Sequence, residues 1–81
     1  SLTLRGLRLA FVPNSVLLKN ELVSLILSGN ELAEIPAGLG RLKNLQKLDV
    51  SENGLIEFPE CVNKLTQLRE LRLAHNNIQA V

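Results

Sequence analysis

The 81-residue chain has few of the residues and segments that support catalysis, membrane insertion or secretion. It contains one Cys, one His and two Phe, but neither Trp nor Tyr. A single Cys cannot form an internal disulfide, and the scarcity of aromatic residues removes the stacking platforms used by single-strand nucleic-acid binders. No apolar run approaches the ~18 residues of a membrane span, and the N-terminus does not resemble a secretory signal. Since Asn-x-Ser/Thr sites are also absent, we expect a reducing, cytoplasmic location.

Neither sign of charge dominates the sequence. Nine Lys and Arg against eight Asp and Glu leave a formal net charge of +1, which disfavours a nucleic-acid or membrane-surface binder. A phosphate-binding surface would have to use the basic residues Lys43, Lys47, Arg69 and Arg72. The acidic residues Asp49, Glu52 and Glu70 are interleaved with them, so we expect no nucleic-acid partner.

The motifs of common catalytic and cofactor sites are missing. The sequence has no P-loop, no complete dinucleotide fingerprint and no Gly-x-Ser-x-Gly elbow. His75 is the only His, so no pair of His residues can bind a metal, and its position in the sequence pattern places it on a different face from Cys61. We interpret Cys61 as a small, partly buried residue. The sequence therefore predicts no catalysis, no metal, no cofactor and no small-molecule substrate.

What the sequence does have is Leu, at 19 positions, arranged in a period of 23 residues. Residues at this interval form columns: Leu22, Leu45 and Leu68; Leu25, Leu48 and Leu71; Leu27, Val50 and Leu73; Asn30, Asn53 and Asn76; Leu32, Leu55 and Ile78; Ile35, Phe58 and Val81; Pro36 and Pro59; Leu39 and Val62; Leu42 and Leu65. An earlier, incomplete copy comprises Leu2, Leu4, Leu9, Val12, Pro13 and Val16. So many columns agree that chance is a poor explanation.

The unit L-x-x-L-x-L-x-x-N-x-L-x-x-[IF]-P-x-x-[LV]-x-x-L-x-x resembles the leucine-rich repeat family over the whole chain. Its length and Ile/Phe-Pro step are similar to those of the 23-residue intracellular type found in Ras-suppressor-like and scaffold proteins. The resemblance implies an α/β leucine-rich repeat solenoid, a right-handed coil with one short parallel strand per repeat on a concave face. A turn, a 3₁₀ segment or a short helix would return the chain on the convex face.

The repeat register divides a single leucine-rich repeat domain, residues 1–81, into four parts. These are a degenerate repeat, 1–21; two full repeats, 22–44 and 45–67; and a partial repeat, 68–81. Because both ends interrupt a repeat, we expect a fragment of a longer solenoid.

Residue patterns within one repeat support the same architecture. Leu48 and Val50 alternate with polar neighbours, as in a half-buried strand. Residues 36–44 contain two Gly and favour a turn or 3₁₀ stretch, whereas residues 59–67 have no Gly and favour a helical turn. Asn30, Asn53 and Asn76 each offer a donor and an acceptor, and we expect them to bond the backbone of successive turns rather than a ligand.

The first repeat departs from the pattern at two positions. Leu7 stands in the Asn column, and Lys19 stands in the column of Leu42 and Leu65. Two interpretations remain open: this is an atypical terminal repeat, or Leu18 shifts into the vacant core position.

The family resemblance implies a protein-binding surface on the concave face. Transferred position by position, the candidate partner-binding residues are Val23, Ile26, Lys47, Asp49, Glu52, Arg69, Glu70, Arg72 and His75. Val23 and Ile26 would form a small apolar patch, with Asp49 beside Arg72 and Lys47 beside Glu70 on neighbouring strands. These charges pair across strands, a structural role, or select a partner, and both roles can hold together.

We therefore expect a protein-interaction module of an intracellular scaffold, adaptor or signalling protein. Two alternatives stay open. One is the recognition arm of a larger kinase, ubiquitin ligase or phosphatase whose catalytic domain lies elsewhere. The other is a solenoid spacer that binds nothing.

Overall fold

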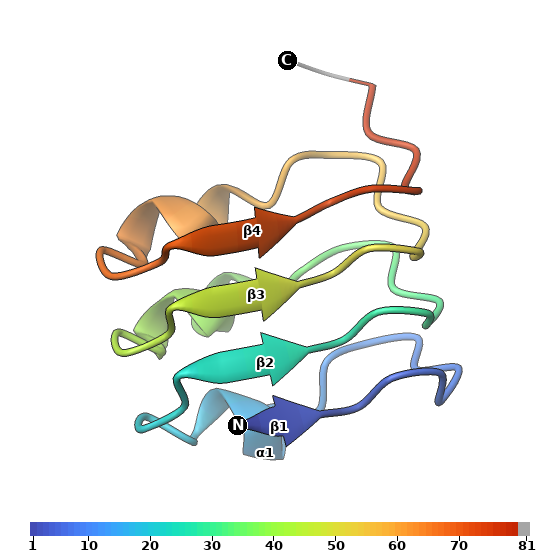
Figure 1. Ribbon diagram of the computed structural model, residues 1–81. Helices are drawn as coiled ribbons and strands as arrows, with labels where there is room; N and C mark the ends of the chain where they lie inside the picture. Colours follow the sequence, from blue (N-terminus) through green and yellow to red (C-terminus); the bar gives the residue numbers. More distant parts are fainter. Residues whose placement is uncertain (80–81) are drawn as a thin grey trace.

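A computed structural model describes residues 1–79 as a short solenoid (Figure 1). Strands and return segments alternate along the chain: β1 (Leu2–Thr3), α1 (Asn14–Leu17), β2 (Ser24–Ile26), the 3₁₀ helix η1 (Ala37–Arg41), β3 (Lys47–Asp49), the 3₁₀ helix η2 (Glu60–Lys64) and β4 (Glu70–Arg72). The strands stack along one side, and α1, η1 and η2 lie behind them. Val81, which the repeat assigns to the column of Ile35 and Phe58, lies outside the described residues.

The four strands form one parallel sheet in the order β1-β2-β3-β4. Leu25 pairs with Leu48, and Leu48 pairs with Leu71, so each step across the sheet is one repeat of 23 residues. Sequence columns are therefore rows of neighbours across the sheet. The predicted leucine-rich repeat solenoid is confirmed, including its short parallel strands and 3₁₀ return segments.

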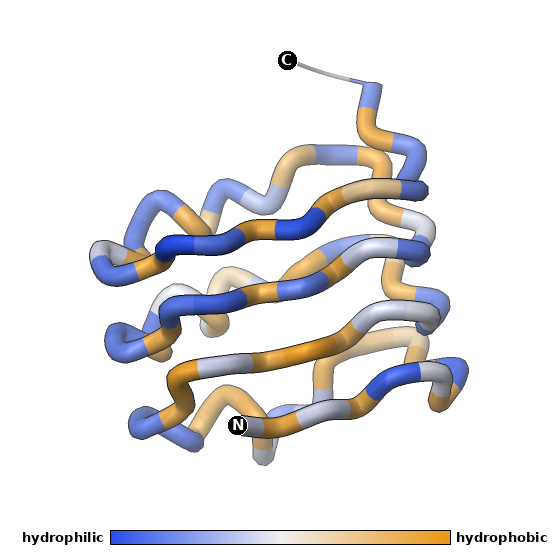
Figure 2. Tube along the Cα trace, in the orientation of Figure 1, coloured by the Kyte–Doolittle hydropathy of each residue, from blue (hydrophilic) through white to orange (hydrophobic). Residues whose placement is uncertain are grey.

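Leu side chains fill the space between the sheet and the return segments. The side chains with no exposed surface are Leu25, Leu27, Leu32, Leu39, Leu42, Leu45, Leu48, Val50 and Leu55. All belong to the two full repeats, which are covered on both sides by neighbouring turns. Figure 2 shows the apolar positions recurring along every turn of the chain. At about 1.5–3 kcal/mol for each buried side chain, this core is the main stabilising term of the fold.

The Asn column satisfies the backbone where each strand turns away from the sheet. Asn53 Oδ1 accepts a hydrogen bond from the Leu32 amide at 3.0 Å. Its Nδ2 donates to Leu27 O, Val50 O and Ser51 O at 3.0–3.1 Å. Asn53 thus joins its own turn to the preceding one, and Asn30 and Asn76 make corresponding bonds. The predicted structural role of these three residues is confirmed.

The position just before the Asn column, which holds Leu7 in the first repeat, adopts a left-handed backbone conformation in all four turns. Gly6 and Gly29 have φ of 68° and 69°, while Glu52 and His75 have φ of 56° and 60°. Gly adopts this conformation without cost, whereas a residue with a Cβ is strained there by roughly 1–2 kcal/mol. The solenoid therefore imposes the same turn on all four residues, and two of them are not Gly.

The first repeat packs differently from the expected shift of Leu18. Leu18 is 73% exposed and does not fill the vacant core position, so that interpretation is wrong. Val16 is buried instead, and Leu17 packs against the core. These two residues occupy the inner side of α1, which leaves the following Leu18 facing outward at the end of the helix.

The return segments of the two full repeats are both 3₁₀ helices of five residues. Each follows a Pro in an extended conformation, Pro36 or Pro59. The turn or 3₁₀ stretch expected at 36–44 is confirmed, and the helical turn expected at 59–67 is a 3₁₀ helix as well. None of the helices in residues 1–79 has the length and apolar character needed to cross a bilayer.

Candidate functional site

The candidate site is the outer surface of the parallel sheet, which we call the sheet face. Successive side chains of a strand point to opposite sides, so Leu25, Leu48 and Leu71 point to the core and their neighbours point to solvent. Two rows cross the sheet face. The first is Ser24, Lys47 and Glu70; the second is Thr3, Ile26, Asp49 and Arg72.

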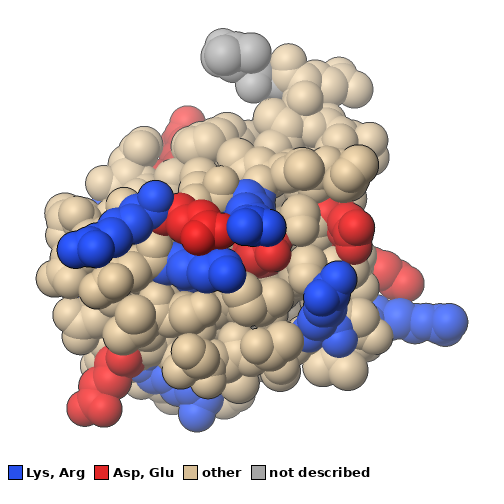
Figure 3. Space-filling model, in the orientation of Figure 1, with Lys and Arg blue, Asp and Glu red and all other residues tan. Residues whose placement is uncertain are grey.

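The predicted charged neighbours are adjacent in the sheet. Lys47 pairs in register with Glu70, and Asp49 pairs with Arg72. Figure 3 shows basic and acidic side chains gathered together over the middle and upper part of this face. We call Lys47, Asp49, Glu70 and Arg72 the charged cluster.

Within the charged cluster, the ion pair runs along β4 and not across strands. Arg72 Nε donates to Glu70 Oε2 at 2.5 Å. This hydrogen bond is the main cause that raises the pKa of the Arg72 guanidinium, with a smaller contribution from Asp49. Among the described residues, neither Asp49 with Arg72 nor Lys47 with Glu70 forms an ion pair. The predicted proximity is therefore right, while the ion pair that forms lies along β4 and is not the cross-strand pairing that was one of the two alternatives.

The carboxylate of Asp49 is used by its own strand end. Asp49 Oδ1 accepts hydrogen bonds from the Ser51 amide at 3.0 Å and the Ser51 hydroxyl at 2.6 Å. These two bonds tie the carboxylate to the residue two positions further along its own chain. Arg72 contacts Glu70, which lies two residues away on the same face of the same strand.

The two apolar candidates lie on the neighbouring part of the sheet face. Ile26 is in β2, paired in register with Asp49, and is half-buried. Val23 precedes β2 and is 44% exposed, and its carbonyl accepts the amides of Gln46 and Lys47. Figure 2 shows β2 as the most apolar strand of the sheet, below the polar β3 and β4. The structure thus places Val23 and Ile26 at the edge of the charged cluster.

Three further candidates flank the strands. Glu52 and His75 follow β3 and β4 at the left-handed position, and both are exposed. Arg69 precedes β4, is exposed, and its amide donates to Gln46 O at 2.8 Å. All nine candidates therefore lie on or beside β2, β3 and β4. No three His, Cys, Asp or Glu side chains within residues 1–79 gather closely enough to hold a metal ion.

Cys61 lies in η2, behind the sheet, while His75 follows β4. Cys61 is 9% exposed, and burial raises the pKa of its thiol. A thiol with a raised pKa is a poor nucleophile because little of it is thiolate at neutral pH. This agrees with the sequence interpretation of Cys61 as a small, partly buried residue.

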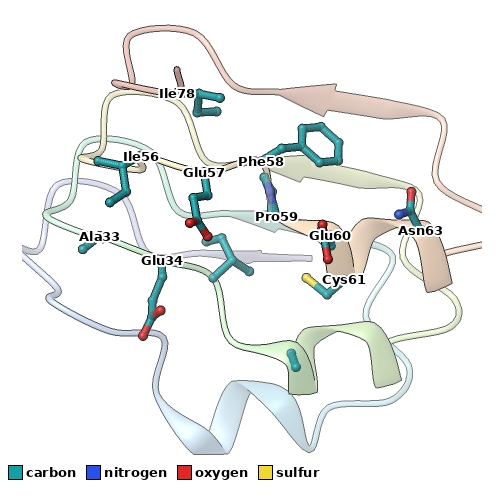
Figure 4. A pocket seen from close by; sticks show the side chains of 12 residues that line it. Ala33, Glu34, Ile56, Glu57, Phe58, Pro59, Glu60, Cys61, Asn63 and Ile78 are labelled. Carbon is teal, nitrogen blue, oxygen red and sulfur yellow. The ribbon is translucent and has the colours of Figure 1, made fainter. Parts of the chain in front are cut away.

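The structure also contains a hollow that the sequence analysis did not predict. It lies between the connections that follow the Asn turns and the beginnings of η1 and η2 (Figure 4). We call it the flank groove; it is lined by Ala33, Glu34, Ile35, Ala37, Ile56, Glu57, Phe58, Pro59, Glu60, Cys61, Asn63 and Ile78. A signal was present in the repeat columns, where Ala33 and Ala37 correspond to the larger residues Ile56 and Glu60.

Comparisons with known proteins agree with this architecture. The family described as "Leucine rich repeat" matches residues 20–78. The solved structure of a leucine-rich repeat protein from Leptospira interrogans is similar, with a TM-score of 0.86 and 29% sequence identity. The match covers 99% of this chain but 24% of the other, so the chain spans about a quarter of that protein's length. The comparison with curated proteins gives no match. Since the family match covers well over half of the residues, the chain belongs to the leucine-rich repeat family.

Proposed function

We propose that this chain is a protein-interaction module whose sheet face binds a protein partner. The observation that carries the proposal is the charged cluster, in which four side chains of both signs are adjacent on an open sheet. Leucine-rich repeats generally act as non-catalytic modules for protein–protein interaction, which supports this assignment.

Recognition by the charged cluster would depend on a complementary arrangement of charges. Asp49 and Lys47 are half-buried on β3, so their positions are defined by the sheet. Arg72 is exposed, and Arg is one of the three residue types enriched at energetic centres of interfaces. Val23 and Ile26 add apolar area beside these charges. A partner with an apolar contact next to a mixed acidic and basic patch would match this surface.

We place this module in an intracellular scaffold, adaptor or signalling protein of the 23-residue repeat type. The single buried Cys and the absence of glycosylation sites support a reducing compartment. The same surface would also serve as the recognition arm of a larger enzyme. In that case, changing the sheet face would raise KM for a protein substrate and leave kcat unchanged.

The test exchanges the two charges that are paired in register. The double variant Asp49→Arg with Arg72→Asp keeps the net charge but reverses the pattern on β3 and β4. A matched control, Glu31→Arg with Arg41→Asp, exchanges charges at exposed positions off the strands. Circular dichroism first establishes that both variants fold. Affinity capture with mass spectrometry then compares their partners with those of the wild type.

Partners lost from the sheet-face variant but retained by the control variant would support the proposal. Identical partner sets in all three forms would contradict the assignment to the sheet face and place binding on another surface, whereas capture of no partner by any form would favour a spacer. Each captured partner is then titrated in purified form, because direct binding separates recognition by the sheet face from indirect capture.

A further inference from the structure

The flank groove is an open hollow of about 1090 Å³ on a surface distinct from the sheet face. Ala33, Glu34 and Ala37 come from one turn of the solenoid, and Ile56, Glu57 and Glu60 occupy the same columns in the next turn. The hollow has a basis in the sequence, because two Ala side chains leave space beside larger residues one turn away.

The groove presents apolar side chains to solvent. Ile56 is 59% exposed and Phe58 is 41% exposed, and both are among the few large apolar side chains on the surface. Ile35 and Ile78 line the same hollow. Figure 4 shows Ile56 and Ile78 on one side of it and Phe58 on the other. An exposed apolar hollow of this kind is a site where burial by a partner releases water favourably.

Every charged side chain that lines the groove is acidic. These side chains are Glu34, Glu57 and Glu60. Glu34 and Glu57 lie in the same column of consecutive turns, and none of the three forms an ion pair within the described residues. Lys64, the basic residue of η2, packs toward η1. Its side chain lies beside Gly40, about 3.0 Å from the position that a Cβ would occupy there. The groove thus combines exposed apolar side chains with charged side chains of one sign.

We propose that the flank groove binds an extended segment of a protein partner, with one bulky apolar side chain flanked by Lys or Arg. The apolar side chain would contact Ile56 and Phe58, and the flanking cations would contact the carboxylates of Glu34 and Glu57. The argument for this occupant is charge complementarity, because an acidic segment would meet three like charges. The proposal does not depend on the sheet face, since no residue is shared between the two surfaces.

The test uses a fluorescein-labelled synthetic peptide with a central Leu between Lys and Arg residues. One comparison peptide carries Glu at every basic position, and a second carries Ser in place of the Leu. Binding to the full chain is followed by fluorescence anisotropy, and the site is mapped from amide chemical shifts by NMR. We expect saturable binding of the basic peptide, with shifts at residues 33–37 and 56–61 and none in β3 or β4.

Two variants probe the two properties of the groove. The pair Glu34→Lys and Glu57→Lys should weaken binding by about tenfold or more, while Glu31→Lys, the same change at an exposed residue outside the lining, should not. Ile56→Ala introduces the residue that stands in the same column one turn earlier, at Ala33, so we expect the variant to fold. It should weaken binding by about fivefold. Leu7→Ala, at a 56% exposed position elsewhere, is the apolar control.

Three results would overturn the proposal. The first is a failure of the basic peptide to bind up to about 1 mM, or equal binding of the acidic peptide. The second is a set of amide shifts confined to the sheet face. The third is sedimentation showing self-association of the chain that Glu34→Lys and Glu57→Lys abolish, which would assign the groove to a second copy.

Discussion

The two halves of the sheet face have the same backbone and opposite surface character. On β1 and β2 the outward positions are Thr3, Ser24 and Ile26, which carry no charge. On β3 and β4 the same rows hold Lys47, Asp49, Glu70 and Arg72. At the left-handed position the first half has Gly6 and Gly29, and the second has Glu52 and His75.

This difference separates what the solenoid requires from what it permits. The core Leu columns and the Asn column are shared by β2 and β3, so they belong to the framework. The outward positions vary without changing the register. Gly at the left-handed position shows that the turn needs no side chain there, so the strained Glu52 and His75 cost stability that the framework does not require. Backbone strain of this kind persists only where the surrounding structure fixes the turn.

The largest expected effect comes from breaking the framework that both halves share. Asn53→Ala removes the hydrogen bonds to the Leu32 amide and to three carbonyls, and leaves several of these groups unpaired in the turn. We expect a loss of about 3 kcal/mol in the free energy of unfolding, measured by urea denaturation. Asn77→Ala, at the exposed Asn that follows Asn76, should change the free energy of unfolding by less than about 0.5 kcal/mol. Equal losses of unfolding free energy in the two variants would show that the Asn column does not stabilise the turns.

Much of this framework follows from the sequence, because its signals repeat. The spacing of Leu25, Leu48 and Leu71 gives both the strands and their register, and the Asn column gives the turn bonds. The first repeat was harder to predict because its signals appear once. Nothing in the residue pattern decides whether Leu17 or Leu18 turns inward at the end of a four-residue helix.

The candidate site was predictable in position but not in its contacts. The 23-residue spacing predicts that Asp49 lies beside Arg72, and the two residues are paired in register between β3 and β4. Arg72 contacts Glu70 and not Asp49, and this choice depends on side-chain torsions that do not follow from spacing. The sequence indicates the flank groove less clearly than the charged cluster, because the groove depends on differences in side-chain volume between consecutive turns.

A smaller effect is expected from exchanging residues at the left-handed position. Glu52→Gly relieves backbone strain but increases the entropy of the unfolded chain, for a net gain of about 0.5–1 kcal/mol. Gly29→Ala is the opposite change, and we expect a loss of similar size. A Cβ at Gly29 would meet no atom closer than 3.6 Å, so the loss reports strain and not a clash. Urea midpoints check both, and a loss of stability in Glu52→Gly would show that the Glu52 side chain is part of the framework.

The smallest effect on stability is expected inside the charged cluster. Glu70→Gln removes the charge that pairs with Arg72, yet the pair is exposed and screened by solvent. We expect no resolvable change in the thermal midpoint, with Glu31→Gln as the matched control at an exposed acidic residue off the strands. A clear fall in the midpoint would show that the pair stabilises the sheet. An unchanged midpoint with weaker partner binding would instead assign the charges to recognition, because the neutral half of the sheet folds in the same way without them.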